Sequence, residues 1–271
     1  MKNNFSDLTV LLVSYKSDEQ ILRLISKFDK RIKIIIVENS LNKNFKNQIE
    51  KKYKNVKVLI PDCNKGWGSG INYAIKKVKS KYIMCLDCDV SITNENISNL
   101  LKKGKTLNSF GVLMPKIYKQ NYKDLIIGFD KINKLPILSF NTGCVMLFKK
   151  KTFLQIGSFD ENYFLYFEET DFFTRCIKKN KKIYLYEKFE VKHGGSISIN
   201  MKYKNDFYIF KSWHYCWSKF YYYRKHFNYL VALSKTFPNL KRSIFGMIKN
   251  LILRNSLNFK LNNAEFRGLI K

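Results

Sequence analysis

The chain has 271 residues, of which 45% are hydrophobic and 15% aromatic, so it can bury a substantial core and is not an intrinsically disordered protein. Its formal net charge of +29 predicts attraction to phosphate-rich partners, namely nucleic acid, an anionic membrane or an acidic substrate. The basic residues are spread along the whole chain, which is not typical of a nucleic-acid-binding tail.

The first residues and the cysteines bear on the cellular compartment. Residues 1–7 are polar and lack the apolar core of a signal peptide, and no apolar run reaches the roughly 18 residues of a spanning helix. Cys85 and Cys88 form a Cys-x-x-Cys without a second pair, and the other cysteines show no disulfide spacing. We therefore expect a cytoplasmic protein with structural thiols.

The first part of the chain alternates strands and helices. Apolar, β-branched runs predict buried strands at residues 8–15, 32–37 and 56–60. Helical stripes follow the first two strands, over residues 21–28 and 45–53. This alternation is typical of a doubly wound α/β domain, in which the carboxyl ends of the strands meet at one crevice.

A glycine-rich segment follows the third strand. Asn64, Gly66, Gly68 and Gly70 are expected in a loop that leads into a helix over residues 71–78, which carries Asn72. Glycines before a helix suit close approach of the backbone to a ligand and an anion at the helix N-terminus. A plain flexible turn explains the glycines equally well.

Two acids end the next strand. Residues 81–86 read as a short strand that is apolar after Lys81, and Asp87 and Asp89 follow with one residue between them. Carboxylates at the end of a buried strand suit Mg²⁺ or Mn²⁺ that carries phosphates. Asp is also common in turns, so a turn that closes the strand is the alternative.

The middle of the chain continues the pattern less regularly. Thr93 is expected to cap a helix to residue 103, and residues 119–141 are expected to form an irregular, substrate-specific loop. Further strands are predicted at residues 110–117, 143–148, 183–186 and 189–193, with a short helix over residues 152–156.

Three acids stand at the start of a predicted helix that reaches residue 179. They are Glu168, Glu169 and Asp171, and an aromatic segment precedes them. Acids are stabilised at a helix N-terminus by the helix dipole, but a carboxylate in an aromatic cleft would also have the raised pKa that a general base needs. His193, beside Gly194 and Gly195, is a candidate for metal or phosphate contact.

From residue 202 onward the sequence is helical, basic and aromatic, with an interruption expected at Pro238. Such helices are typical of docking on an anionic membrane surface. Packing on the core with a solvated lysine face explains them equally well.

Six blocks, in the order of a known family, carry a resemblance over residues 8–200. They are residues 13–17, 36–40, 64–72, 86–89, 141–148 and 157–171. In these blocks the chain resembles the family 2 glycosyltransferases of the GT-A fold, especially the bacterial rhamnosyltransferase-like branch. The resemblance implies an α/β fold with a mostly parallel central sheet and a C-terminal helical extension. We expect a nucleotide-sugar-binding half at residues 1–105, an acceptor half at 106–200 and the extension at 201–271.

The function implied by the resemblance is an inverting, metal-dependent transfer of a sugar in surface polysaccharide biosynthesis. The donor would be a nucleoside-diphosphate sugar, with dTDP-rhamnose suggested by the branch, and the acceptor a glycan or a polyprenyl-diphosphate-linked glycan. We expect the protein to lie at the inner face of the cell membrane. Alternatives from other classes are a basic nucleic-acid-binding protein and a nucleotidyltransferase.

The resemblance also implies roles for individual residues. Asp87, Asp89 and His193 would hold Mg²⁺ or Mn²⁺, and Glu169 would be the general base. The implied nucleotide-sugar contacts are Ser14, Tyr15, Glu38, Asn64, Gly66, Gly68, Asn72 and Asp87. The family usually has Asp at positions 38 and 169 and Asn at position 16, where this chain has Glu38, Glu169 and Lys16, so Asp171 stands as an alternative base.

Overall fold

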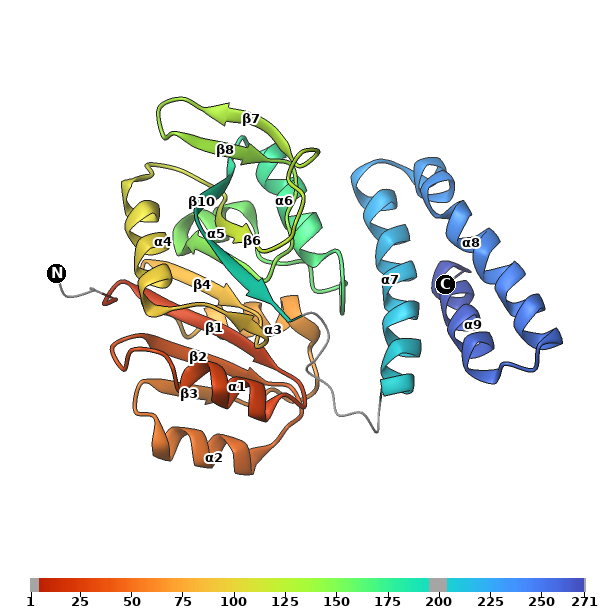
Figure 1. Cartoon of the computed structure of the whole chain (residues 1–271), viewed down its shortest axis with the longest axis horizontal. Coiled ribbons are helices and arrows are strands. Elements are labelled where there is room, and N and C mark those ends of the chain that lie inside the picture. Colours follow the sequence, from red (N-terminus) through yellow and green to blue (C-terminus); the bar gives the residue numbers. More distant parts are fainter. Residues whose placement is uncertain (1–4, 195–203, 271) are drawn as a thin grey trace. The chain divides into compact units, whose positions relative to one another are not determined.

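The computed structural model describes residues 5–194 and 204–270. The chain divides into two compact units, which are coloured along the sequence in Figure 1. The first comprises Met1–Asp160 and Glu169–Ser198, and the second Glu161–Glu168 and Ile199–Lys271.

A single mixed sheet forms the centre of the first unit (Figure 1). Its strands are β1 (Leu8–Ser14), β2 (Lys33–Glu38), β3 (Val56–Leu59), β4 (Tyr82–Leu86), β5 (Val90–Ser91), β6 (Val112–Ile117), β7 (Ile126–Asp130), β8 (Leu135–Leu138), β9 (Val145–Lys149) and β10 (Ile183–His193). The order is β3-β2-β1-β4-β9-β6-β10-β8-β7, with β5 paired to β10. The first four strands in this order run parallel, whereas β9 is antiparallel to both β4 and β6.

Helices cover both faces of the sheet. They are α1 (Asp18–Ile25), α2 (Lys43–Lys52), α3 (Gly66–Ile75), α4 (Asn94–Thr106), α5 (Lys150–Ile156) and α6 (Glu168–Lys178). Buried side chains of α1, α2 and α4 share one apolar cluster with Val10 and Leu12 of β1, and those of α3, α5 and α6 share the other with Leu11. Burial on both faces explains why the strands are nearly continuous apolar runs.

Two expectations about strands were wrong. Within residues 119–141, predicted to be irregular, β7 and β8 form an antiparallel hairpin. The hairpin is anchored by Asp130, whose carboxylate accepts hydrogen bonds from Lys182 and Tyr184, both at 2.6 Å. The two strands predicted at 183–186 and 189–193 are one strand, β10, with a register shift between Tyr186 and Glu190.

The described part of the second unit contains three helices, α7 (Lys204–His226), α8 (Tyr229–Ile252) and α9 (Ser256–Ile270), which pack against one another. The predicted interruption at Pro238 is wrong, because α8 continues through it. The helix begins at Asn228, whose side chain accepts the backbone N–H of Val231 at 2.9 Å. Among the described helices, none has both the length and the apolar character needed to cross a bilayer.

Candidate active site

An acidic cluster lies where β4 leaves the sheet. Asp87 and Asp89 follow β4 directly, and the backbone N–H of Asp87 donates to the carbonyl of Cys144 at 3.0 Å. His193 ends β10, and the pairing of β10 with β5 brings its Nε2 within 3.4 Å of Asp87 Oδ2 and 3.2 Å of Asp89 Oδ1. Residues far apart in the sequence therefore meet in this cluster. Gly195, also named in the sequence analysis, lies outside the described residues.

The donor atoms of this cluster fit a divalent cation. One atom from each of Asp87, Asp89 and His193 lies within 4.8 Å of the others. Carboxylate oxygens suit Mg²⁺ and Mn²⁺, and an imidazole nitrogen suits transition metals. Three protein ligands leave coordination positions open for a ligand such as a diphosphate. Without an ion, hydrogen bonds to the two carboxylates raise the pKa of His193 to about 10.

The neighbouring cysteines are not members of this cluster of donor atoms. Cys85 is buried in β4, and the thiols of Cys85 and Cys88 are free. Burial raises the pKa of Cys88 to about 11.

Glu169, near the start of α6, is a carboxyl group with perturbed acidity. Burial, and to a lesser extent the charge of Asp87, raise its pKa to about 7. Its side chain lies against Gly143, where an added Cβ would stand 3.2 Å from Glu169 Cγ. Because Cys144 follows Gly143 and accepts the N–H of Asp87, the carboxyl group and the acidic cluster share one edge of the sheet.

Asp171, the alternative base, is fully buried and engaged. Its Oδ2 accepts a hydrogen bond from Arg175 Nε at 2.7 Å, and the guanidinium also donates to the carbonyls of Gly157 at 2.6 Å and Ser158 at 2.9 Å. This carboxylate is therefore turned toward Arg175, and the Arg175 guanidinium fixes the segment before α6.

The predicted nucleotide contacts Ser14, Tyr15 and Glu38 lie at the carboxyl ends of β1 and β2. Ser14 is buried, and its Oγ has no hydrogen-bond partner among the described residues, while Tyr15 is 38% exposed. The carboxylate of Glu38 accepts the backbone N–H groups of Ser40, at 3.0 Å, and Asn42. Glu38 thus closes the loop after β2, so the longer side chain at this position has a structural function.

The glycine-rich segment was predicted to be a loop, and this prediction is wrong. The segment forms the first turns of α3, which begins at Gly66. Gly66 has a φ of +73° and donates its N–H to Asn64 Oδ1 at 3.0 Å, while Asn39 Nδ2 donates to its carbonyl at 3.0 Å. Gly68 is buried within the helix, and the Cβ of an alanine at Gly70 would stand 3.1 Å from Val13. Close packing of α3 on β1 therefore accounts for Gly70, and the positive φ accounts for Gly66.

Asn72 binds protein backbone. Its side chain donates to the carbonyl of Phe159 at 2.8 Å and accepts the N–H of the same residue at 3.1 Å. This pair of hydrogen bonds joins α3 to the segment before α6. We infer that Asn72 shapes the site without presenting this amide to a ligand.

Asn39 and Gly143 were missed as site residues by the sequence analysis. Asn39 directly follows the last residue of β2, so the rule that ligands gather at strand ends could have identified it. The importance of Gly143 depends on a contact with a residue far along the chain, and no local pattern predicts such a contact.

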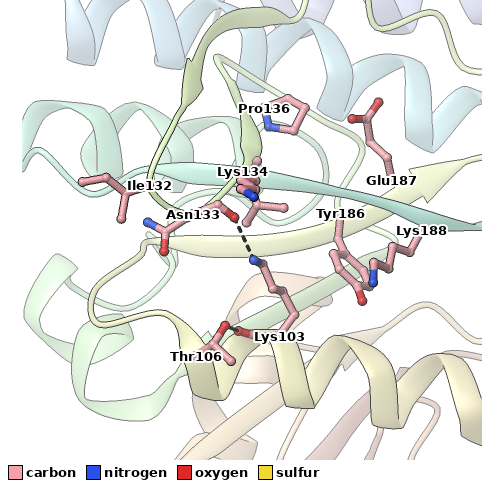
Figure 2. A pocket seen from close by; sticks show the side chains of 10 residues that line it. Lys103, Thr106, Ile132, Asn133, Lys134, Pro136, Tyr186, Glu187 and Lys188 are labelled. Carbon is pink, nitrogen blue, oxygen red and sulfur yellow. Dashed lines mark hydrogen bonds between the residues drawn. The ribbon is translucent and has the colours of Figure 1, made fainter.

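A pocket of about 680 Å³ lies elsewhere in the first unit (Figure 2). It is lined by the turn of the β7–β8 hairpin, by Lys103 and Thr106 near the end of α4, and by residues of β10. Lys103 Nζ donates to the carbonyl of Asn133 at 2.8 Å across it. None of the predicted site residues lines this pocket.

Comparison with known proteins connects this geometry to a family. The family model for glycosyl transferase family 2 matches residues 9–163. This chain belongs to glycosyl transferase family 2. The match includes residues 9–14 of β1, the glycines of α3, Asp87 and Asp89.

Two curated proteins are similar to this chain over part of their length. A low-salt glycan biosynthesis hexosyltransferase of Haloferax volcanii is 25% identical over 198 residues, which cover 65% of this chain and 64% of the relative. A poly-beta-1,6-N-acetyl-D-glucosamine synthase of Staphylococcus aureus is 27% identical over 199 residues, which cover 66% of this chain and 46% of the relative. The chain therefore matches less than two thirds of the length of either relative.

Solved structures show the fold of this family 2 chain. A mannosyltransferase of Pyrobaculum calidifontis, in complex with GDP-Man and Mn²⁺, has a TM-score of 0.62 at 9% identity, covering 98% of this chain and 86% of that one. TarS of S. aureus, in complex with UDP-GlcNAc, has a TM-score of 0.53 at 15% identity, covering 97% and 90%. These likenesses confirm the predicted GT-A fold with a C-terminal helical region.

Proposed function

We propose that this family 2 protein transfers a sugar from a nucleoside-diphosphate donor to an acceptor hydroxyl in glycan biosynthesis. The observation that carries the proposal is the meeting of Asp87, Asp89 and His193 at the same sheet edge as Glu169. The relatives add support, because they are named a hexosyltransferase and an N-acetylglucosamine polymer synthase.

In this proposal Asp87, Asp89 and His193 hold Mg²⁺ or Mn²⁺. A bound ion supplies positive charge against the donor diphosphate, on which negative charge grows as the sugar leaves. Asp89 has an 11% exposed side chain, against 28% for Asp87, so Asp89 is the better shielded of the two carboxylates.

Glu169 is the proposed general base. Its carboxylate takes the proton of the acceptor hydroxyl while the hydroxyl oxygen attacks the anomeric carbon on the face opposite the diphosphate, so the configuration inverts. A pKa of about 7 suits proton abstraction near neutral pH. Asp171 is the weaker candidate, because Arg175 already holds its carboxylate.

The donor would lie along the carboxyl ends of β1, β2 and β4. The nucleotide would be contacted by Ser14, Tyr15 and the start of α3. Asp87 would lie near the diphosphate of the donor. The mannosyltransferase neighbour binds GDP-Man and the TarS neighbour UDP-GlcNAc, which supports a nucleotide sugar as the donor class. In keeping with the resemblance, we propose dTDP-rhamnose as the first donor to test.

The acceptor is proposed to be a glycan carried on a polyprenyl diphosphate, and the protein to act at the inner face of the cell membrane. Support comes from the excess of basic residues in the second unit, since an anionic lipid-linked acceptor is attracted by such charge. We also propose that residues 1–105 bind the donor and residues 106–200 the acceptor.

A panel of nucleotide sugars tests the proposal. With Mn²⁺ present, the cognate donor should raise the melting temperature by mass action, and noncognate donors should raise it less. The cognate donor should then be hydrolysed slowly, and nuclear magnetic resonance of the glycoside formed with an added acceptor should show inverted anomeric configuration. A protein that neither binds nor hydrolyses any nucleotide sugar would exclude this function.

A further inference from the structure

The second unit contains a helix whose apolar residues point outward. The buried residues of α8 are Ala232, Thr236, Asn239 and Ser243, all small or polar. The exposed residues that we call the outer face are Leu230, Leu233, Phe237, Ile244, Phe245, Ile248, Leu251 and Ile252. A helix at the surface of a protein in water normally shows the reverse arrangement.

The inward side of α8 is complete without the outer face. Thr236 Oγ1 donates to the carbonyl of Ala232 at 2.7 Å, Ser243 Oγ donates to that of Leu240 at 2.8 Å, and Lys219 of α7 donates to Asn239 Oδ1 at 2.7 Å. Because the buried polar groups are satisfied, the helix is seated with its small residues inward. Small residues at helix contacts are typical of helices whose outer surroundings are lipid.

The outer face runs along most of α8. Its residues are one, three, four or seven positions apart, which at about 3.6 residues per turn places them on one side of the helix, whose 24 residues extend for about 36 Å. The side chains of Phe237 and Phe245 are each 61% exposed, and those of Leu251 and Ile252 are 68% and 75% exposed. Contiguous apolar surface of this kind marks an interaction site.

Positive charge borders this stripe. Lys235 and Lys249 lie on one flank of it, together with Arg242, which pairs with Glu265 at 2.9 Å, and α8 contains no acidic residue. Lys241 stands within the stripe, with its ammonium 5.9 Å from the centre of the Phe245 ring, so it can extend past the apolar surface to a polar layer. Between residues 204 and 270, Asp206 and Glu265 are the only acids, against twelve lysines and arginines.

We propose that the outer face of α8 lies in the plane of an anionic lipid surface, with its apolar side chains below the headgroups and its lysines at the phosphates. Charge complementarity favours lipid over a second copy of this chain, because two copies of the face would bring their lysines together. The helix would lie in the interface, since no described helix can span a bilayer. The proposal does not depend on the proposed sugar transfer.

Sedimentation of the full chain with vesicles tests the proposal. Vesicles of phosphatidylcholine alone are compared with vesicles that also contain phosphatidylglycerol. Wild-type protein should bind the anionic vesicles. The affinity of the variant Phe237→Ser/Phe245→Ser/Ile248→Ser for these vesicles should be lower by at least about tenfold. The matched control is Ile127→Ser/Ile132→Ser in the exposed β7–β8 hairpin, which should bind as wild type does. Lys235→Gln/Lys249→Gln should reduce the preference for anionic vesicles.

A second variant reports insertion of the outer face directly, so the test does not rest only on variants that lose binding. Phe245→Trp keeps the face apolar, and wild type, which has three tryptophans, is its reference. Relative to wild type, the fluorescence of the variant should shift to the blue with anionic vesicles and be quenched more strongly by brominated lipid. The proposal is overturned if wild type binds neither vesicle, or if the hairpin control loses binding equally. It is also overturned if the outer-face variant binds vesicles as wild type does but no longer self-associates, because a second copy would then cover this face. The same holds if the variant binds vesicles normally but has a lower melting temperature, because the face would then be covered within the chain.

Discussion

Nε2 of His193, the last residue of β10, lies 3.2 Å from Oδ1 of Asp89 in the turn after β4. The contact depends on β5, a strand of two residues that pairs His193 with Val90. A short antiparallel pairing at the edge of the site thus completes the proposed ligand set, which neither strand provides alone.

This ligand set leads to a prediction about metal binding. Asp89→Asn and His193→Gln should each weaken Mn²⁺ binding by at least about tenfold, because each removes a donor atom. The measurement is the rise in melting temperature on adding Mn²⁺ without nucleotide. Asp124→Asn, which alters an exposed acid outside the cluster, is the control and should respond to Mn²⁺ as wild type does. Equal responses from all four proteins would contradict the assignment.

The pH dependence of turnover tests Glu169. A carboxyl group whose pKa is about 7 is protonated below that pH and cannot accept a proton, so kcat should rise with pH through about 7 and then level off. Glu169→Gln should lower kcat by about 10² to 10⁴-fold and abolish this inflection, with donor affinity retained. A flat wild-type profile between about pH 6 and 8 would argue against this base.

Asp171→Asn should instead affect stability. The substitution leaves the Arg175 guanidinium, 18% exposed, without its buried carboxylate partner, and should cost about 2–3 kcal/mol of unfolding free energy in a denaturant titration. The kcat inflection near pH 7 should persist in this variant. Loss of the inflection with stability intact would reverse the assignments of Asp171 and Glu169.

Gly143→Ala tests the contact that positions the base. The new Cβ would stand 3.2 Å from Glu169 Cγ and 3.3 Å from Met146 Cε, so the Glu169 side chain must move by a few tenths of an ångström. We expect kcat to fall about tenfold with donor affinity unchanged, because proton abstraction is sensitive to such displacements. The control is Gly128→Ala, where the nearest atom would be 3.9 Å away, and its kcat should equal that of wild type.

Asp130 should make the free energy of unfolding decrease as the pH falls into the acid range. Hydrogen bonds from Lys182 and Tyr184, and from the backbone and side chain of Asn133, hold the pKa of this carboxyl well below its usual value of 3.8. Its contribution is therefore present above about pH 4 and is lost as the pH falls below that value. Asp130→Asn should lower the unfolding free energy at pH 7 by about 2 kcal/mol, and the difference from wild type should shrink in acid. A constant difference between about pH 2 and 7 would contradict this account.

The sequence correctly predicted the strands that are buried on both faces and a helix start that is fixed by a neighbouring side chain. The apolar runs gave β1, β2 and β4 within one or two residues, and Thr93 caps α4 as expected, accepting the N–H of Asn96 at 3.1 Å. Asp87 and Asp89 could be found because they follow a strand that is buried on both faces.

What the sequence did not predict depends on distant contacts. Gly66 begins a helix because Asn39, from another strand end, binds its carbonyl, and propensity at glycine gives no sign of this. The β7–β8 hairpin lacks a buried face in β7, where only Asp130 is buried, so hydrophobic periodicity does not reveal it. Pro238 stays within α8 because tertiary packing outweighs the lost backbone hydrogen bond.

The antiparallel pairing of β4 with β9 sets how the protein tolerates changes in chain length. Cys85 faces Met146 in one apolar cluster, and Leu86 faces Val145 in the other. Deleting a single residue from β9 would exchange these faces and carry Gly143 away from the proposed base. Insertions in the exposed turn between β7 and β8 leave this register intact, so length polymorphism among homologous sequences should concentrate in that hairpin and avoid β9.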